Sequence, residues 1–162
     1  MKGAKSTNKL SFYLARMAAR GFTAEQVLAG TGLNAERIFS DAFRANPQQY
    51  RQVILNIIEL TGDPCIGIAI GAEFKISYLG VLGYAALSAA TLEQAREVFT
   101  KYHSLSEHIF TSTNHISDGR WFSEVRDTFM LGDVIRFAVE EFVSRTIELA
   151  SSITNKPFPI LE

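Results

Sequence analysis

The sequence is poor in the residues that build disulfide frameworks, metal centres and many active sites. It has one cysteine, Cys65, and three histidines, His103, His108 and His115, among 162 residues. A disulfide framework needs cysteines in pairs, so a small domain held together by disulfides is excluded. The chain also has no His-Glu-x-x-His motif, glycine-rich phosphate loop or nucleophile elbow. We therefore expect no catalytic residue, no metal and no cofactor, and an enzyme would require two or more of these four residues to meet in a cleft.

Neither sign of charge is in excess, and no apolar run is long. The 16 basic and 17 acidic side chains give a formal net charge of -1, so the chain has no general attraction to nucleic-acid phosphates. The longest apolar run, Tyr78 to Ala90, would span about 20 Å as a helix, short of the roughly 30 Å hydrocarbon layer of a bilayer. We interpret it as core, and the polar start from Met1 to Lys9 is not a signal sequence. These features predict a cytoplasmic protein that does not contact a membrane.

Helices are predicted from the start of the chain. Apolar residues recur at helical spacing from Leu10 to Arg20, and Gly21 follows where a terminating residue belongs. Thr23 to Gln26 form a capping box that opens a second helix, and Asn34 can cap a third. These two short helices imitate a DNA-binding helix-turn-helix, but the segment from Asn34 to Asp41 has one arginine against two carboxylates. We interpret them as structural.

The middle of the chain repeats a helix-start signal. Asn46 followed by Pro47 predicts a helix that runs to Gly62. Asp63 and Pro64 give the same signal for a brief buried segment, which we expect Gly67 and Gly71 to break. Close packing against a neighbouring element is the interpretation of these two glycines.

The second half combines a β-hairpin with a long helix. Thr91 to Gln94 form a capping box for a helix that reaches Tyr102. From His108 to Arg126, β-branched and aromatic residues flank Ser117-Asp118-Gly119, the pattern of a hairpin. Leu131 to Thr154 form a long amphipathic helix. The expected fold is α+β and predominantly helical, with an antiparallel β-hairpin packed against a long C-terminal helix, in a single domain over residues 1–162.

Polar side chains beside aromatic residues make the hairpin a candidate ligand site. Strand alternation places Phe122, Glu124 and Arg126 on one face and Trp121 on the other. An arginine beside aromatic residues could hold a carboxylate in an otherwise apolar pocket. A solvated strand face is the alternative interpretation of Glu124 and Arg126.

Two predicted helices supply further candidates. Glu140 and Glu141 lie within the apolar final helix, where one of them could face inward and contact a cationic ligand, unless both are exposed to solvent. Tyr102 and His103 are adjacent, and a lone histidine is more often an ordinary surface or core residue than a haem or metal ligand. The predicted ligand-binding residues are Trp121, Phe122, Glu124, Arg126, Glu140, Tyr102 and His103.

An ordered set of stretches covers nearly the whole chain. No single stretch is specific, but the set in this order is; the stretches are Leu14–Phe22, Val27–Leu33, Leu60–Gly71, Tyr78–Ser88, Thr91–Ala95, Tyr102-His103, Leu131–Asp133 and Phe137–Phe142. Together they resemble the arabinose-binding-type sensory domain at the amino terminus of AraC-type bacterial transcription regulators.

The resemblance implies a sensor of a small-molecule effector. In that family the sensory domain precedes a C-terminal pair of helix-turn-helix units that binds promoter DNA, so DNA would be contacted only through a domain not present in this sequence. Members respond to varied effectors, including amino acids, so arabinose is not implied and no effector-contacting motif is carried over. Phe158 to Glu162 resemble the entry to a further strand, and we expect the sensory domain to be cut before its last strands. A homodimer is a possible assembly, and a dimerisation or interaction module without a ligand is the competing function.

Overall fold

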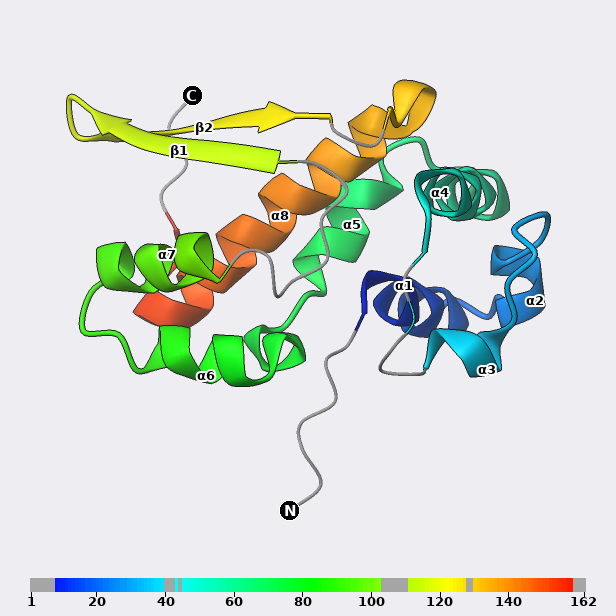
Figure 1. Ribbon diagram of the computed structural model, residues 1–162, viewed down its shortest axis with the longest axis horizontal. Coiled ribbons are helices and arrows are strands. Elements are labelled where there is room, and N and C mark those ends of the chain that lie inside the picture. The colour runs from blue at the N-terminus through cyan, green and yellow to red at the C-terminus, as the bar shows by residue number, and fades with distance from the viewer. Residues whose placement is uncertain (1–7, 40–42, 44, 103–110, 128–129, 159–162) are drawn as a thin grey trace, which may run out of the picture.

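The computed structural model describes residues 8–39, 43, 45–102, 111–127 and 130–158. Its elements in chain order, with short 3-10 helices labelled η, are α1 (Lys9–Ala18), α2 (Ala24–Val27), α3 (Ala35–Ile38), α4 (Pro47–Thr61), α5 (Ile66–Ala72), η1 (Ile76–Leu79), α6 (Val81–Leu87), α7 (Leu92–Lys101), β1 (Thr111–Ser117), β2 (Arg120–Arg126), η3 (Gly132–Val134) and α8 (Ile135–Thr154). Figure 1 shows α1 to α4 at one end of the molecule and α6 and α7 at the other, with α5 and α8 running between them. The expected α+β, mainly helical fold with a long C-terminal helix is confirmed.

The helix ends follow most of the predicted capping signals. The Thr23 side chain accepts a hydrogen bond from the Gln26 backbone amide, and the Gln26 side chain accepts one from the Thr23 amide. Asn46 and Gln49 form the same reciprocal pair at the start of α4. Gly62 ends that helix in the left-handed region at φ 64°. These bonds satisfy backbone groups that a helix end leaves without intrahelical partners, which explains why local sequence defines the boundaries.

The β-hairpin also forms where the sequence predicted it. β1 and β2 pair antiparallel with Ser117 opposite Arg120, so the turn consists of Asp118 and Gly119. Both turn residues have positive φ, at 51° and 71°, as a tight two-residue hairpin requires. Val125 is the half-buried strand residue that packs against the core, while most other side chains of the hairpin described by the structure are exposed.

α5 and α8 share the most extensive contact between helices in the described part of the chain. A Cβ atom added at Gly67 would lie 2.6 Å from the carbonyl oxygen of Phe137, and one added at Gly71 would lie 2.5 Å from that of Glu141. The interpretation that these glycines serve close packing is confirmed. The expectation that they break the segment is wrong, because both lie inside α5. A glycine weakens a helix only modestly, and here the missing side chain lets two backbones touch.

The hydrophobic core draws its largest side chains from both ends of the chain. Asn56 adds a polar contact between α4 and the end of α2, which we call the Asn56 clasp. Its side-chain amide nitrogen donates hydrogen bonds to the carbonyl oxygens of Val27 at 2.9 Å and Ala29 at 2.8 Å. α4 thereby holds the end of α2. The largest fully buried apolar side chains are Tyr13, Tyr50, Phe137, Leu10, Met17, Ile38, Ile54, Ile57, Ile70 and Leu131.

The apolar run from Tyr78 to Ala90 is not core throughout, which corrects the interpretation from sequence. Val81 is 77% exposed and Tyr84 is 63% exposed. The helix α6 is buried through small residues instead, because a Cβ atom on Gly83 would lie 2.2 Å from the carbonyl oxygen of Ile76. With the inward side formed by close backbone contact, the large apolar side chains are left on the outward side.

Among the described residues, no single helix is long and apolar enough to cross a bilayer. α4 and α5 reach the required length and composition only when taken together, and they are bent by 103° relative to each other. Both contribute buried residues to the core.

Candidate functional site

The predicted hairpin residues lie on an exposed strand face. By strand alternation, Phe122, Glu124 and Arg126 point to the face opposite Val125. Arg126 Nε lies 3.0 Å from Glu124 Oε1, and the ring of Phe122 stacks on that of His115 with centroids 5.2 Å apart. Glu124 and Arg126 therefore form an ion pair with each other on this face. Their role in ligand binding stays a prediction.

The remaining aromatic candidates are only partly covered by the structure. Tyr102 caps the C-terminal end of α7 and is 42% exposed, with Lys101 Nζ 5.5 Å from its ring centroid. Trp121 pairs with Ile116 across the hairpin backbone, but its side chain falls outside what the structure describes. His103 lies outside the described residues.

The two glutamates of α8 have different environments. Glu141 is fully buried and faces Lys9, whose Nζ lies 2.7 Å from its Oε2, with Arg145 Nη1 at 3.5 Å from its Oε1. Glu140 instead pairs with the exposed Arg136 at 2.8 Å. The glutamate that faces inward is therefore Glu141, and its cationic partners are side chains of the chain itself. A role for Glu140 in ligand binding stays a prediction.

The buried Glu141 carboxyl is held in its charged form. Burial would raise its pKa, because a charge loses hydration inside the protein. The positive charges of Arg145 and Lys9 outweigh this effect, and the net direction is a pKa below the ordinary value of 4.5. The carboxylate and the Lys9 ammonium thus form a charged pair shielded from water.

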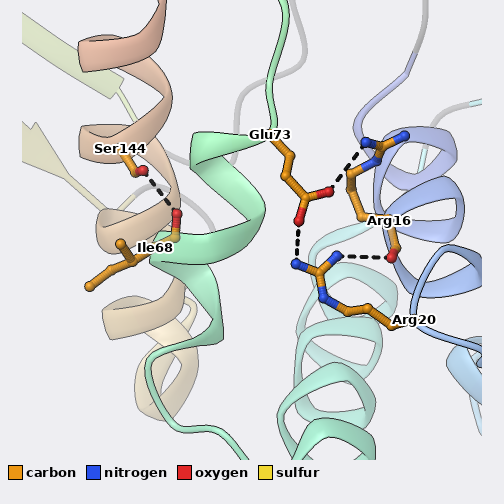
Figure 2. Close-up of polar contacts among 5 residues, drawn as sticks. All are labelled: Arg16, Arg20, Ile68, Glu73 and Ser144. Atoms are coloured by element: carbon orange, nitrogen blue, oxygen red, sulfur yellow. Dashed lines mark hydrogen bonds and ion pairs between the residues drawn. The ribbon is translucent and has the colours of Figure 1, made fainter. Parts of the chain in front are cut away.

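A second ion-pair cluster joins α1 to the end of α5. Glu73 follows α5 directly, and Figure 2 shows its carboxylate between Arg16 of α1 and Arg20, which lies just beyond the end of that helix. Arg16 Nη1 lies 3.2 Å from Glu73 Oε2, Arg20 Nη2 contacts Glu73 Oε1, and Arg20 Nη1 donates a hydrogen bond to the Arg16 carbonyl oxygen at 2.9 Å. Arg20 reaches the same carboxylate from the turn after α1, in which its backbone amide donates a hydrogen bond to the carbonyl oxygen of Met17 at 3.0 Å. These side chains are partly exposed, unlike Lys9 and Glu141.

Aromatic rings connect the two clusters. The rings of Phe12 and Phe74 meet edge to face with centroids 5.1 Å apart, and Tyr78 contacts both. The guanidinium of Arg16 lies 5.7 Å from the Phe12 centroid, and that of Arg145 lies 5.3 Å from the Phe74 centroid. We call the four basic and two acidic residues around these rings the charge junction; they are Lys9, Arg16, Arg20, Arg145, Glu73 and Glu141.

Most of the charge junction was not identified from the sequence. Glu141 was one of two glutamates considered for an inward position, whereas Lys9, Arg16, Arg20 and Glu73 were not singled out. A helix from Leu10 to Arg20 would place the two arginines on one side, but α1 ends at Ala18. No local signal links either arginine to Glu73, because that contact joins segments far apart in the sequence.

The residues that an enzyme would need contact different neighbours where they are described. The Cys65 sulfur accepts a hydrogen bond from Arg136 Nη2 at 2.9 Å, and His115 stacks on Phe122 in the hairpin. His103 and His108 lie outside the described residues. Within the part of the chain that the structure covers, no group of three or more His, Cys, Asp or Glu residues could hold a metal ion.

Comparison with known proteins gives a consistent set of relatives. An ornithine utilization regulator of Pseudomonas aeruginosa is 25% identical over 143 residues, which cover 81% of this chain and 42% of that protein. Uncharacterised helix-turn-helix transcriptional regulators of Mycobacterium bovis and Mycobacterium tuberculosis are each 26% identical over 135 residues, covering 82% of this chain and 39% of theirs. The chain thus spans about two fifths of the length of these relatives. No solved structure matches.

The family assignment rests on a match over most of the chain. Residues 21–162 match the family described as the arabinose-binding domain of AraC transcription regulators, N-terminal. The match includes α2 to α8, together with both strands. The chain therefore belongs to the family of N-terminal arabinose-binding domains of AraC transcription regulators, as its ordered motifs had indicated.

Proposed function

We propose that the chain senses a small-molecule effector on behalf of a transcription regulator. The observation that carries this proposal is the family match over residues 21–162. In the proposed mechanism the effector binds one arrangement of the sensory part more tightly than another, and DNA-binding units of a longer protein respond to the shift. DNA contact belongs to those units in this proposal, rather than to α2 and α3.

The charge junction is the proposed binding site of the effector. A buried ion pair is weak evidence for a stabilising role, because an apolar pair of similar volume is often as stable or more so. The ammonium of Lys9, which pairs with Glu141, also lies 5.8 Å from the centroid of the Tyr13 ring. Ligand sites commonly combine apolar walls with a few polar groups that fix orientation, and the partly exposed arginines beside Phe12 and Phe74 provide that combination.

The arrangement of the helices suggests how binding would be transmitted. α5 and α8 touch backbone to backbone at Gly67 and Gly71, so they are expected to move together. Lys9 of α1 pairs with Glu141 of α8. Arg16, in the last turn of α1, and Arg20, just after it, pair with Glu73. An effector that competes for these ion pairs would change the seating of α1 and leave the α5–α8 pair intact.

A ligand screen on the full-length regulator tests the proposal. One relative is named for ornithine and the family for arabinose, so the screen includes L-ornithine, other amino acids, L-arabinose and sugar acids. A ligand that binds only the folded state increases the free energy of unfolding, by about 2.7 kcal/mol at a concentration one hundred times its Kd. The midpoint of thermal unfolding rises accordingly. We expect at least one compound to raise the midpoint and to change the affinity for promoter DNA. A complete screen with neither effect would contradict effector sensing.

A dimerisation module without a ligand is the competing function. The exposed Val81 and Tyr84 of α6 are the kind of surface side chains that such a module would use. Light scattering on the full-length regulator, with and without each compound that stabilises it, separates the two. If the protein is a sensor, we expect its oligomeric state to change when ligand is added. If it is a dimerisation module, we expect a dimer in every condition. The homodimer and the cytoplasmic location both stay predictions.

A further inference from the structure

We infer that Arg16 and Arg20 form a binding site for the carboxylate of the effector, and that the side chain of Glu73 is an internal carboxylate which the effector displaces. This inference rests on the proposed function and adds a chemical class to it. The effector would be a small molecule that carries a carboxylate.

The two guanidinium groups are held in position by contacts other than Glu73. Arg20 donates to the carbonyl oxygen of Arg16 at 2.9 Å, and the Arg16 guanidinium lies 5.7 Å from the centroid of the Phe12 ring. Arg16 lies in the last turn of α1, and Arg20 lies in the turn that directly follows it. A site whose donors are already placed loses less conformational entropy on binding, so these arginines are prepared for a second carboxylate.

Glu73 leaves part of the Arg16 donor set unused. Its carboxylate contacts Arg16 only through Nη1, at 3.2 Å. Within the described part of the chain, the buried Nε of Arg16 has no hydrogen-bond partner. Buried donors are nearly always paired, and a guanidinium binds a carboxylate best through two parallel N–H groups. A carboxylate seated against Nε and Nη of Arg16 would pair the donor that Glu73 leaves unpaired.

Of the two carboxylates in the charge junction, Glu73 is the one that can be displaced more easily. Its side chain is 35% exposed, whereas that of Glu141 is 0% exposed. Ion pairs that are partly exposed to solvent contribute little net stability. Exchange of Glu73 for another carboxylate therefore costs little free energy. The junction has four basic and two acidic residues, so it keeps a positive balance while Glu73 is present. This balance favours an anion over a cation as the arriving group.

The surroundings fit a small organic acid. Phe12, Phe74 and Tyr78 form a ring cluster next to Arg16, and the half-buried Tyr78 offers apolar surface to the rest of the molecule. Displacement of Glu73 would release the end of α5 from α1. The same event that binds the effector would therefore change how α1 is attached.

The experiment uses pairs of compounds that differ in the carboxylate. Calorimetric titration of the full-length regulator compares L-ornithine with 1,4-diaminobutane, and L-arabinonate with L-arabinose. We expect binding only from the carboxylate-bearing member of a pair, with at least about a tenfold difference in Kd, the value of a charge-assisted bidentate contact. Binding of 1,4-diaminobutane or L-arabinose with equal affinity would overturn the carboxylate assignment and leave effector sensing intact. If no compound of the wider screen binds, effector sensing itself fails, and the carboxylate site fails with it.

Variants then test the residues. Glu73→Gln keeps the shape but removes the competing charge, so we expect tighter binding of the carboxylate probe, by about three- to tenfold. Arg20→Gln is expected to weaken binding by about tenfold or more. Glu93→Gln breaks the exposed pair with Arg96 and serves as the matched control, with unchanged Kd. Circular dichroism confirms that each variant is folded.

Two outcomes would overturn the assignment. A folded Glu73→Gln protein with a lower unfolding midpoint and an unchanged Kd would make Glu73 a structural brace between α1 and α5. Loss of binding in Arg126→Ala, with full binding in Arg20→Gln, would place the carboxylate on the hairpin face that the sequence predicted.

Discussion

A Cβ atom on Gly71 would lie 2.5 Å from the carbonyl oxygen of Glu141, so α5 and α8 meet there at the level of their backbones. Gly67, one turn earlier, has the same relation to Phe137 at 2.6 Å. No side chain can bend to relieve either contact, because a backbone oxygen is the neighbour. The helix that carries the buried Glu141 is therefore positioned by two glycines of α5.

Replacement of one of these glycines should destabilise the fold. Gly71→Ala forces the two helices apart, and we expect a loss of about 1–3 kcal/mol in the free energy of unfolding. Urea denaturation measures it. Ala72→Ser is the control, because it also adds one heavy atom to α5 but at an exposed position, and it should change stability by less than about 0.5 kcal/mol. Equal values for the two variants would contradict the close contact.

The Lys9–Glu141 pair should behave as a coupled unit. Lys9→Met leaves the buried carboxylate with Arg145 as its remaining cation, and we expect a loss of about 3 kcal/mol. Adding Glu141→Gln to that variant should recover part of the loss, because the unpaired charge is removed. Denaturation of the two single variants and the double variant gives the coupling energy. Additive losses would show that the two residues do not interact, and Lys75→Met, at an exposed position, should have little effect.

Acid should weaken the fold through Glu141. Its pKa is below 4.5 in the folded state, because Arg145 and Lys9 outweigh the opposing effect of burial. A lowered pKa contributes stability that is present above the unfolded value of 4.5 and is lost as the pH falls through the folded value. The stability difference between wild type and Glu141→Gln should therefore be constant at neutral pH and shrink below about pH 4.5. A difference that stays constant down to about pH 2 would show that the carboxyl is not held ionised.

Asn56 should be sensitive to replacement by a residue that cannot donate. Asn56→Leu leaves the carbonyl groups of Val27 and Ala29 without this donor, at a cost of about 1–3 kcal/mol for buried groups. Asn56→Asp should be at least as harmful, since it places a carboxylate against two carbonyl oxygens. Glu59→Gln, at an exposed position of the same helix, is the control for chemical denaturation. A neutral Asn56→Leu would mean that water replaces the lost donor.

Local signals predicted the boundaries of the fold because caps and turns are local interactions. The capping box at Thr23, the N-cap at Asn46, the stop at Gly62 and the turn at Asp118 and Gly119 each involve residues within a few positions. The glycines of α5 were predicted to pack closely but not to stay helical. A single sequence does not reveal that a neighbouring backbone compensates for their low helix propensity.

The orientation of elements was harder to predict than their extent. Val81 and Tyr84 are apolar yet exposed, because the inward side of α6 is formed by small residues. The charge junction joins α1, α5 and α8, and contacts such as Lys9 to Glu141 depend on how distant segments meet. Periodicity marks which residues share a face. It does not say which face finds a partner.

The clasp from Asn56 implies an order of events during folding. A four-residue helix such as α2 gains too few internal hydrogen bonds to persist alone, because helix nucleation is costly. The carbonyl groups at its end find their donor on α4, a helix of 15 residues that has its own caps. α4 is thus the template on which α2 is completed, and the amides of α2 should be the earlier ones to exchange with deuterated solvent.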